Sequence, residues 1–326
     1  IIFTSGGTES NNLAIKGVAY RNKDKGNHII TTTIEHISVI NICKHLQKQG
    51  FETTHVPVDK QGMVDPKKLK DEITDKTIII SVMYTNGEIG TIQPIKEIGK
   101  IAHDNQIYFH VDAVAAAGKV PINVQEENTD LLSISSNDMY GPKGVGALYI
   151  KRGTRIQAVM QGGGQERGLR SGTENIPGIV GMGKAAEIAR EEMETEGRRL
   201  SQLRDKLIKG ALDTIEWSYL NGHPTRRLPN NANLRFSYIE GESLILGLDM
   251  LGIQVSSGSA CTSKTLEPSH VLLAIGLAHE EAHGSLVFTM GKQNSEEDVD
   301  YVLEVLPGVV KRLRAMSPLT PKEMLR

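Results

Sequence analysis

The chain has 326 residues, of which 37 are lysine or arginine and 39 are aspartate or glutamate, so its formal net charge is −2. This balance gives no general reason to bind nucleic acid or an anionic membrane surface, and no apolar run approaches the ~20 residues of a membrane span. Two cysteines argue against a disulfide framework and favour a reducing, cytoplasmic setting. The length exceeds that of one hydrophobic core and predicts a large and a small domain.

Strands and helices alternate through the first half of the chain. Residues 77–84 are apolar enough to be buried on both faces, as a central parallel strand must be. The alternation predicts an α/β domain with a mainly parallel sheet over residues 1–185. Because Ile1 reads as the middle of a strand, we expect residues upstream of it to be missing from this sequence. Strands are predicted at 1–4, 28–36, 77–84 and 107–112, and helices from Thr8 onward and at about 38–49 and 95–105.

Polar residues stand at the ends of these strands. Thr8 opens a helix after a glycine turn, and such a junction presents free backbone N–H groups to an anion. His36 and Asp112 each end a predicted strand. Residues 133–149 form a strand, a polar turn and a second strand, Val145 to Ile150. Ligands of open α/β sheets lie beyond the carboxyl ends of strands, so this edge is the predicted site.

The second half predicts a smaller α+β domain over residues 186–326, entered through a long helix at about 176–213. Cys261 lies among small hydroxyl residues and Gly258, in a loop that leaves a thiol accessible. Cys43, in contrast, reads as a small core residue. Further strands are predicted at 234–238 and 285–289, and further helices at 242–251 and 295–316.

One competing pattern lies in this half. His279-Glu280-Glu281-Ala282-His283 matches the zinc-protease motif, in which two histidines one helical turn apart bind metal and a glutamate acts as base. The match is short, Gly284 follows at once and no third histidine of the metzincin kind appears. The zinc metalloprotease is therefore kept as a remote alternative.

Nine segments in this order resemble the cysteine desulfurases of the IscS/NifS type, which are pyridoxal-phosphate enzymes of fold type I in the class-V aminotransferase family. Each segment alone is weak evidence, but together they are specific and span nearly the whole chain. They are TSGGTES (4–10), EH (35–36), NGEIG (86–90), HVDA (110–113), YGPKG (140–144), RSGT (170–173), EGES (240–243), SSGSAC (256–261) and LEPS (266–269).

The resemblance implies a role for each matching residue. Asp112 would pair with the pyridine nitrogen and His36 would stack on the ring. Thr173 would reach the phosphate of a neighbouring subunit, which implies a homodimer. Cys261 would attack the sulfur of L-cysteine and carry a persulfide to an iron–sulfur scaffold protein of the IscU type. The implied cofactor-binding residues are Gly7, Thr8, His36, Asn86, Asp112, Ser135, Asn137 and Thr173.

The chain departs from the family at the residue that carries the chemistry. The family has a His-Lys pair whose lysine forms the Schiff base with the cofactor, and Asn137 and Asp138 stand there instead. A carboxylate cannot form an imine, so pyridoxal phosphate is expected to bind non-covalently. Lys143 is not a substitute, because the family has a lysine there as well. Three other family residues are also absent: Ala115 replaces a glutamine, Gly87 an asparagine, and Val287 an arginine that clamps the substrate carboxylate.

Two functional hypotheses follow from these departures. In the first, the protein delivers sulfur from L-cysteine through Cys261 for iron–sulfur cluster assembly, with Asp138 as general base and reduced or unconventional catalysis. In the second, it no longer desulfurates, and Cys261 serves a scaffold protein as a sulfur carrier or as a shared ligand of a [2Fe-2S] cluster. Another fold type I activity, aminotransfer or selenocysteine lysis, is a third possibility.

Overall fold

The computed structural model describes residues 1–258 and 268–321. The backbone forms two compact units. The first unit comprises Ile1–Asp59, Met63–Asn86 and Ile92–Met193, and the second comprises Lys60–Gly62, Gly87–Thr91 and Glu194–Arg326. The domain boundary predicted at residues 185 and 186 stays a prediction, because compactness of the backbone alone does not define a domain.

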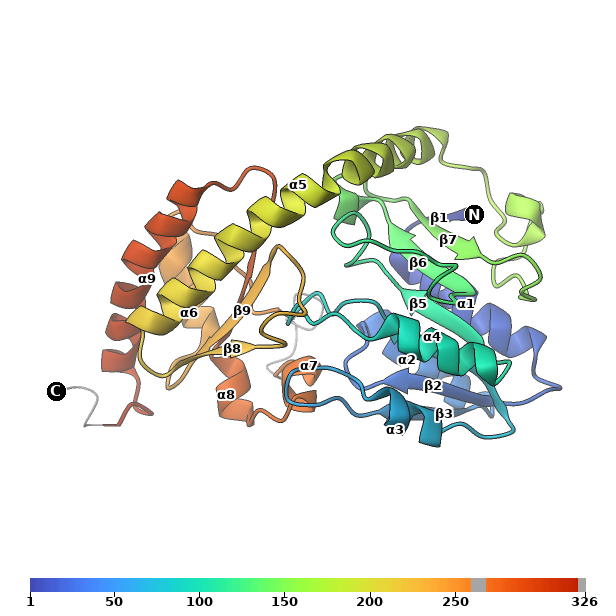
Figure 1. The fold of residues 1–326 in the computed structure, drawn as a ribbon, viewed down its shortest axis with the longest axis horizontal. Helices are drawn as coiled ribbons and strands as arrows, with labels where there is room; N and C mark the ends of the chain where they lie inside the picture. The colour runs from blue at the N-terminus through green and yellow to red at the C-terminus, as the bar shows by residue number, and fades with distance from the viewer. Residues whose placement is uncertain (259–267, 322–326) are drawn as a thin grey trace. The chain divides into compact units, whose positions relative to one another are not determined.

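The first unit contains a seven-stranded sheet with the strand order β1-β7-β6-β5-β4-β2-β3 (Figure 1). The five strands from β6 to β3 pair in parallel, whereas β7 pairs antiparallel with both β6 and β1. The mainly parallel sheet predicted from the sequence is therefore confirmed. The strands are β1 (Ile2–Thr4), β2 (His28–Thr32), β3 (Glu52–Val56), β4 (Thr77–Met83), β5 (Tyr108–Asp112), β6 (Leu131–Ser135) and β7 (Gly146–Ile150).

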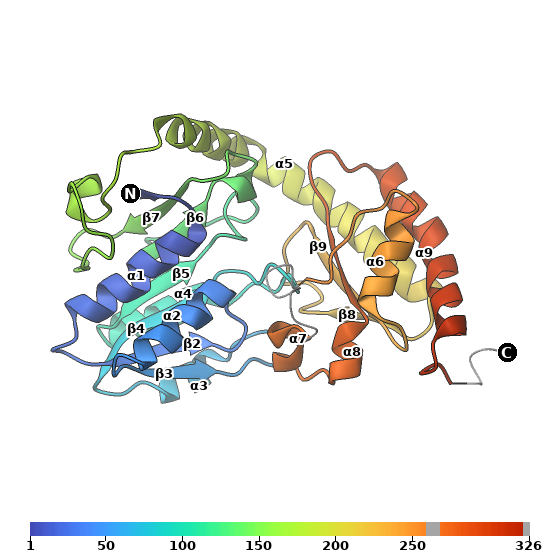
Figure 2. The ribbon, with the colours of Figure 1, turned by 180° about the vertical axis from the view of Figure 1, so that it is seen from behind.

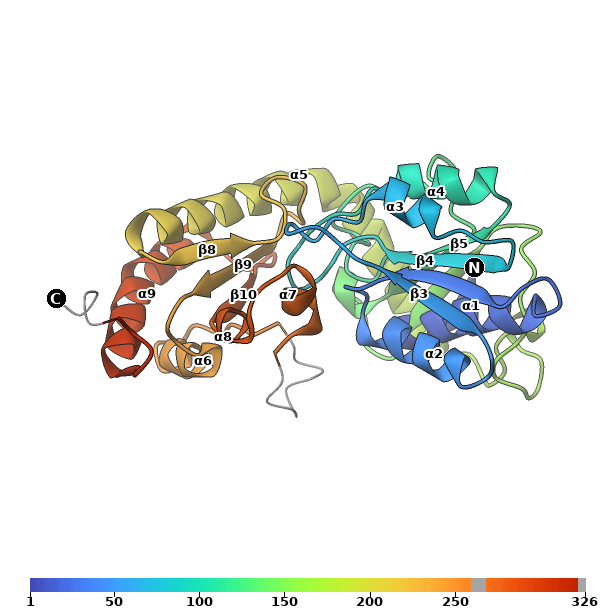
Figure 3. The same ribbon diagram turned by 90° about the horizontal axis from the view of Figure 1, so that it is seen from below.

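Helices cover both faces of this sheet, α1 and α2 on one side and α3 and α4 on the other (Figures 2 and 3). All seven residues of β4 and all five of β2 are buried as a result. Their runs of isoleucine, valine and threonine suit a strand that packs against helices on two sides. The helices are α1 (Gly7–Arg21), α2 (Ile37–Gln47), α3 (Pro66–Asp71) and α4 (Ile95–Asp104), with 3₁₀ turns η1 (Asn137–Met139) and η2 (Glu166–Gly168).

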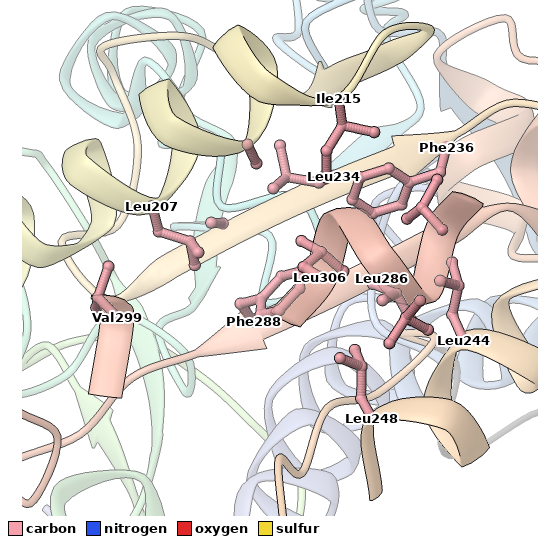
Figure 4. Packing of buried hydrophobic residues seen from close by; sticks show 14 of the residues in the cluster. Leu207, Ile215, Leu234, Phe236, Leu244, Leu248, Leu286, Phe288, Val299 and Leu306 are labelled. Carbon is pink, nitrogen blue, oxygen red and sulfur yellow. The ribbon is translucent and has the colours of Figure 1, made fainter. Parts of the chain in front are cut away.

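The second unit is built on a three-stranded antiparallel sheet with the order β10-β9-β8. Helix α5 (Ile176–Thr214) begins in the first unit and ends in the second. Leucines of α5, α6 and α9 pack with Leu234, Phe236 and Phe288 of this sheet into one apolar core (Figure 4). The remaining elements are β8 (Ser218–Asn221), β9 (Asn231–Phe236), β10 (Ser285–Thr289), α6 (Gly241–Asp249), α7 (His270–Ala274), α8 (His279–His283) and α9 (Glu296–Met316).

The strand predicted at 28–36 is shorter in the structure. Strand β2 ends at Thr32, and His36 is the N-cap of α2, where its side chain accepts a hydrogen bond from the Ser38 N–H. The chain leaves the sheet early because the Thr32 hydroxyl donates to Glu35 Oε1 at 2.6 Å, which closes a turn. Among the helices of residues 1–258 and 268–321, none has the length and apolar character that crossing a membrane requires.

Candidate cofactor site

The predicted site residues of the first unit gather at one edge of its sheet. Strands β2, β4, β5 and β6 run parallel, so their carboxyl ends share this edge. Asp112 is the last residue of β5 and Ser135 the last of β6, while His36 and Asn86 follow β2 and β4. This is the edge at which open α/β sheets bind ligands.

Asp112 is a buried carboxylate held by two donors. Asn11 Nδ2 donates to its Oδ2 at 2.7 Å, and the Val114 N–H donates to its Oδ1 at 3.1 Å. Burial raises the pKa of Asp112, and the negative charge of Asp138 raises it further, while the two hydrogen bonds and His36 lower it. A buried acid in this condition is stabilised in its charged form by a nearby cation. A protonated pyridine nitrogen is such a cation.

Asn11 links Asp112 to His36, and the sequence reasoning did not identify it. Its Nδ2 also donates to Ser38 Oγ at 3.0 Å, and that hydroxyl lies 2.7 Å from His36 Nδ1. Its Oδ1 is buried and has no hydrogen-bond partner among the described residues. The sequence could have pointed to Asn11, because it lies one helical turn after Gly7. That spacing places a polar side chain on the buried face of α1, next to the predicted anion site.

The turn before α1 forms a cradle for an anion. Gly6 has φ of +153°, a conformation that favours glycine, and no atom would lie within 4 Å of a Cβ built on it. The next residue is packed tightly, since a Cβ on Gly7 would lie 2.5 Å from Val114 Cγ2. Helix α1 starts at Gly7 and Thr8, so its first N–H groups have no acceptor within the helix. These features fit a phosphate group at the positive end of the helix.

The turn η1 carries Asn137 and Asp138, the two residues that the sequence is expected to have in place of a His-Lys pair. Asn137 accepts a hydrogen bond from the Ser135 hydroxyl at 2.6 Å, and its own Nδ2 donates to Asp138 Oδ2 at 3.1 Å. On its other side Asp138 faces Lys119, whose Nζ lies 3.8 Å from Oδ1. Burial raises the pKa of Asp138, while Lys119, His36 and Asn137 lower it. Lys119 was not predicted as a site residue. It lies 19 positions before Asp138, and no sequence motif connects the two.

Three predicted residues remain, and of these only Asn86 follows a strand of this sheet edge. Asn86 is buried and donates to the Ile34 carbonyl at 3.0 Å, which ties the loop after β4 to the turn before α2. Thr173 is exposed, on the segment between η2 and α5. Cys261 lies outside the described residues. The roles assigned to all three stay predictions.

A model of the class-V aminotransferases matches residues 1–302 of this chain. The chain belongs to the class-V aminotransferase family. A curated relative, the cysteine desulfurase IscS 1 of Archaeoglobus fulgidus, is 60% identical over 319 residues, which are 98% of this chain and 83% of that protein. The cysteine desulfurase IscS of Methanosarcina thermophila is 60% identical over 323 residues, 99% of this chain and 80% of its own.

Solved structures agree with this assignment. A NifS-like protein matches with a TM-score of 0.88 at 38% identity, covering 95% of this chain and 82% of its own. A NifS-like protein of Rickettsia africae matches with a TM-score of 0.84 at 30% identity, covering 94% and 81%. The predicted resemblance to cysteine desulfurases and the predicted fold class, a fold type I class-V aminotransferase, are confirmed.

Two further positions that the sequence is expected to have changed, Ala115 and Val287, lie one in each unit. In the first unit, Ala115 follows Val114 in the loop after β5, and its carbonyl accepts a hydrogen bond from Lys119 Nζ at 3.1 Å. In the second unit, Val287 is buried in β10 and its backbone bridges to Ser256. An apolar side chain at this position cannot form the charged contact of an arginine.

The zinc-protease alternative gains no support. Helix α8 spans only the five residues of the motif, and Glu281 accepts a hydrogen bond from the Ala278 N–H at its start. Within residues 1–258 and 268–321, no three His, Cys, Asp or Glu side chains lie together as a metal site would require.

Proposed function

We propose that this protein delivers sulfur from L-cysteine, through Cys261, for iron–sulfur cluster assembly, and that it binds pyridoxal phosphate without a covalent bond. The observation that carries the proposal is the site at the edge of the first sheet. The glycine turn before α1 and the buried Asp112 suit the cofactor, whereas Asp138 stands where an amine would be needed to bond it. The similarity to cysteine desulfurases supplies the substrate class.

Each residue of the site has a task that its environment supports. The N–H groups at Gly7 and Thr8, with the Ser135 hydroxyl, would hold the phosphate. Asp112 would keep a proton on the ring nitrogen, and His36, held through Ser38 and Asn11, would stack on the ring. Asn86 and Asn137 complete the polar lining. When bound, pyridoxal phosphate supplies an electron-withdrawing ring that weakens bonds at the α-carbon of an amino acid.

Asp138 is the proposed general base. Its carboxyl cannot bond to the cofactor, but burial raises its pKa toward the range in which a carboxylate both accepts and returns a proton. A base of this kind is weaker than a lysine amine. We therefore propose that catalysis is slower in this protein than in relatives that have a lysine at this position.

Cys261 is the proposed sulfur acceptor. Its thiolate would attack the sulfur of the substrate, so that the carbon–sulfur bond breaks, a persulfide bond forms on Cys261 and alanine leaves. Cys43 is unsuited to this task, because it lies on the buried face of α2 and burial raises its pKa to about 12. A scaffold protein would then accept the sulfur from Cys261. We propose that the protein works as a homodimer in the cytoplasm.

A second function is favoured by two specific residues. Asp138 and Val287 together remove the amine and the arginine on which turnover would depend. Under this second function the protein does not remove sulfur from cysteine. Cys261 instead acts as a sulfur carrier, or as one ligand of a [2Fe-2S] cluster shared with the scaffold protein.

Sulfur transfer from [³⁵S]cysteine separates these functions. The purified chain is incubated with labelled cysteine, pyridoxal phosphate and a thiol reductant, and released sulfide and protein-bound label are measured. We expect label on the protein and slow sulfide release, both falling to the level of protein-free buffer in Cys261→Ala and remaining in Cys43→Ala. Label that survives in Cys261→Ala would contradict the role of Cys261. Absence of label in the unmodified chain would favour the second function.

A further inference from the structure

Lys119 lies beside the site but has no part in the function proposed above. It ends the loop that follows Asp112, and its Nζ lies 3.8 Å from Asp138 Oδ1 while donating to the Ala115 carbonyl at 3.1 Å. The exposed fractions of the two charged side chains are only 20% for Lys119 and 28% for Asp138. The ammonium is therefore largely removed from water and directed at the proposed base.

The backbone holds this pair together. Gly118 has φ of +74°, and a Cβ there would lie 3.0 Å from Met139 Cγ and 3.1 Å from Ala189 Cβ. Ala117 and Met139 also belong to one buried apolar cluster. The loop before Lys119 thus packs directly on the residue that follows Asp138, so the backbones that carry the two charged side chains are held close together.

The charges around Asp138 show what the lysine does. The groups that act on Asp138 are Lys119, His36 and its neighbour Asn137, and each of them lowers its pKa against the effect of burial. The second acid of the site, Asp112, is made harder to ionise by the charge of Asp138. A buried and a half-buried carboxylate repel one another and would repel an anionic phosphate, and a cation among them reduces that repulsion.

We propose that Lys119 is the positioning residue of this site: its ammonium orients the Asp138 carboxylate and compensates its charge, so that the site accepts an anionic cofactor. This inference rests on the role proposed for Asp138. It differs from it because Lys119 acts through Asp138 and touches neither substrate nor cofactor.

A carboxyl titration tests the pairing directly. The full chain is labelled with [γ-¹³C]aspartate, the Asp138 signal is assigned by its absence in Asp138→Asn, and its titration is followed by NMR without cofactor. In Lys119→Met the midpoint moves to higher pH, because the cation that favours the ionised form is gone. Lys119→Arg keeps the midpoint near that of the unmodified chain.

The matched control is Lys143→Met, which removes an exposed lysine from the neighbouring turn. It leaves the Asp138 midpoint unchanged. Pyridoxal phosphate binding, measured by fluorescence, weakens roughly fivefold in Lys119→Met, as expected for a partly buried ion pair. In the Asp138→Asn background, Lys119→Met has no further effect on pyridoxal phosphate binding.

An unchanged midpoint in Lys119→Met, an equal shift in Lys143→Met, or a cofactor adduct on Lys119 itself would overturn the inference. The titration needs no cofactor, so it decides the role of Lys119 separately from the proposed function. A chain that shows the shift but binds no pyridoxal phosphate would contradict the proposed function and leave the pairing in place.

Discussion

Glu35 is a buried acid of the first unit that belongs to one of the nine matching segments but was given no role there. Its Oε1 accepts hydrogen bonds from the Thr32 hydroxyl at 2.6 Å and from the Met83 N–H at 3.1 Å. Its pKa is raised to about 8, because burial and the charge of Asp112 raise it by more than the two hydrogen bonds lower it. The folded chain therefore keeps Glu35 protonated at neutral pH, although the unfolded chain releases that proton.

This difference makes stability depend on pH. Between the ordinary carboxyl value near 4.5 and about 8, the folded state binds one more proton than the unfolded state, so the free energy of unfolding falls as pH rises. We expect Glu35→Gln to remove this fall, which amounts to a few kcal/mol at most. Urea unfolding midpoints at pH 5 and pH 8 measure it.

The control for this experiment is Glu97→Gln, because Glu97 is exposed on α4. It should retain the pH dependence of the unmodified chain. A slope that is the same in Glu35→Gln and in the unmodified chain would show that Glu35 is already ionised in the folded state.

Individual site residues could be predicted where they end a strand, and could not where they depend on a partner far along the chain. Asp112 and Ser135 are the last residues of apolar strands, so their place at the sheet edge follows from strand periodicity. Lys119 and Asn11 contact the site only because a loop and a helix fold over that edge. No local pattern encodes such a contact.

At the scale of elements, the start of helix α1 forms the anion cradle. Gly7 lets that end of the helix pack closely against the loop that follows Asp112. Because a Cβ at Gly7 would lie 2.5 Å from Val114 Cγ2, Gly7→Ala forces the start of α1 away from the loop that follows Asp112. We expect a loss of about 1–3 kcal/mol in the free energy of unfolding, with weaker binding of pyridoxal phosphate. Urea unfolding and fluorescence titration measure the two effects.

Gly197→Ala is the matched control for this substitution. Gly197 lies within α5, and no atom would lie within 4 Å of a Cβ built on it. The added methyl group should stabilise the chain by up to about 1 kcal/mol, because alanine favours a helix more than glycine does. If both substitutions had the same effect, tight packing at Gly7 would not be what positions α1.

Most elements follow from the sequence because strands and helices differ in their apolar period. Strand β4 and helices α4, α5 and α9 lie within a few residues of their predicted ranges. Pairing between strands is not encoded in this way. The antiparallel pairing of β7 with β1 joins segments more than 140 residues apart, as Ile2 opposite Leu148 shows.

At the scale of the whole molecule, the match to class-V aminotransferases extends over residues 1–302, whereas the proposed change in chemistry rests on a few positions, Asp138 above all. Asp138 lies in the 3₁₀ turn η1, outside the strands of the sheet, and its side chain is half-buried. A family fold therefore does not guarantee the family's chemistry. Whether pyridoxal phosphate bonds covalently to the protein decides how much cysteine desulfurase activity we expect the chain to retain.

Borohydride reduction tests that state most directly. The full chain is saturated with pyridoxal phosphate, reduced, dialysed and digested, and its peptides are analysed by mass spectrometry, with Asp138→Lys as the control that should retain a pyridoxyl group. We predict that the unmodified chain loses its cofactor absorbance on dialysis and carries no stoichiometric pyridoxyl adduct. A stoichiometric adduct on Lys143 or Lys119 would contradict the account of Asp138.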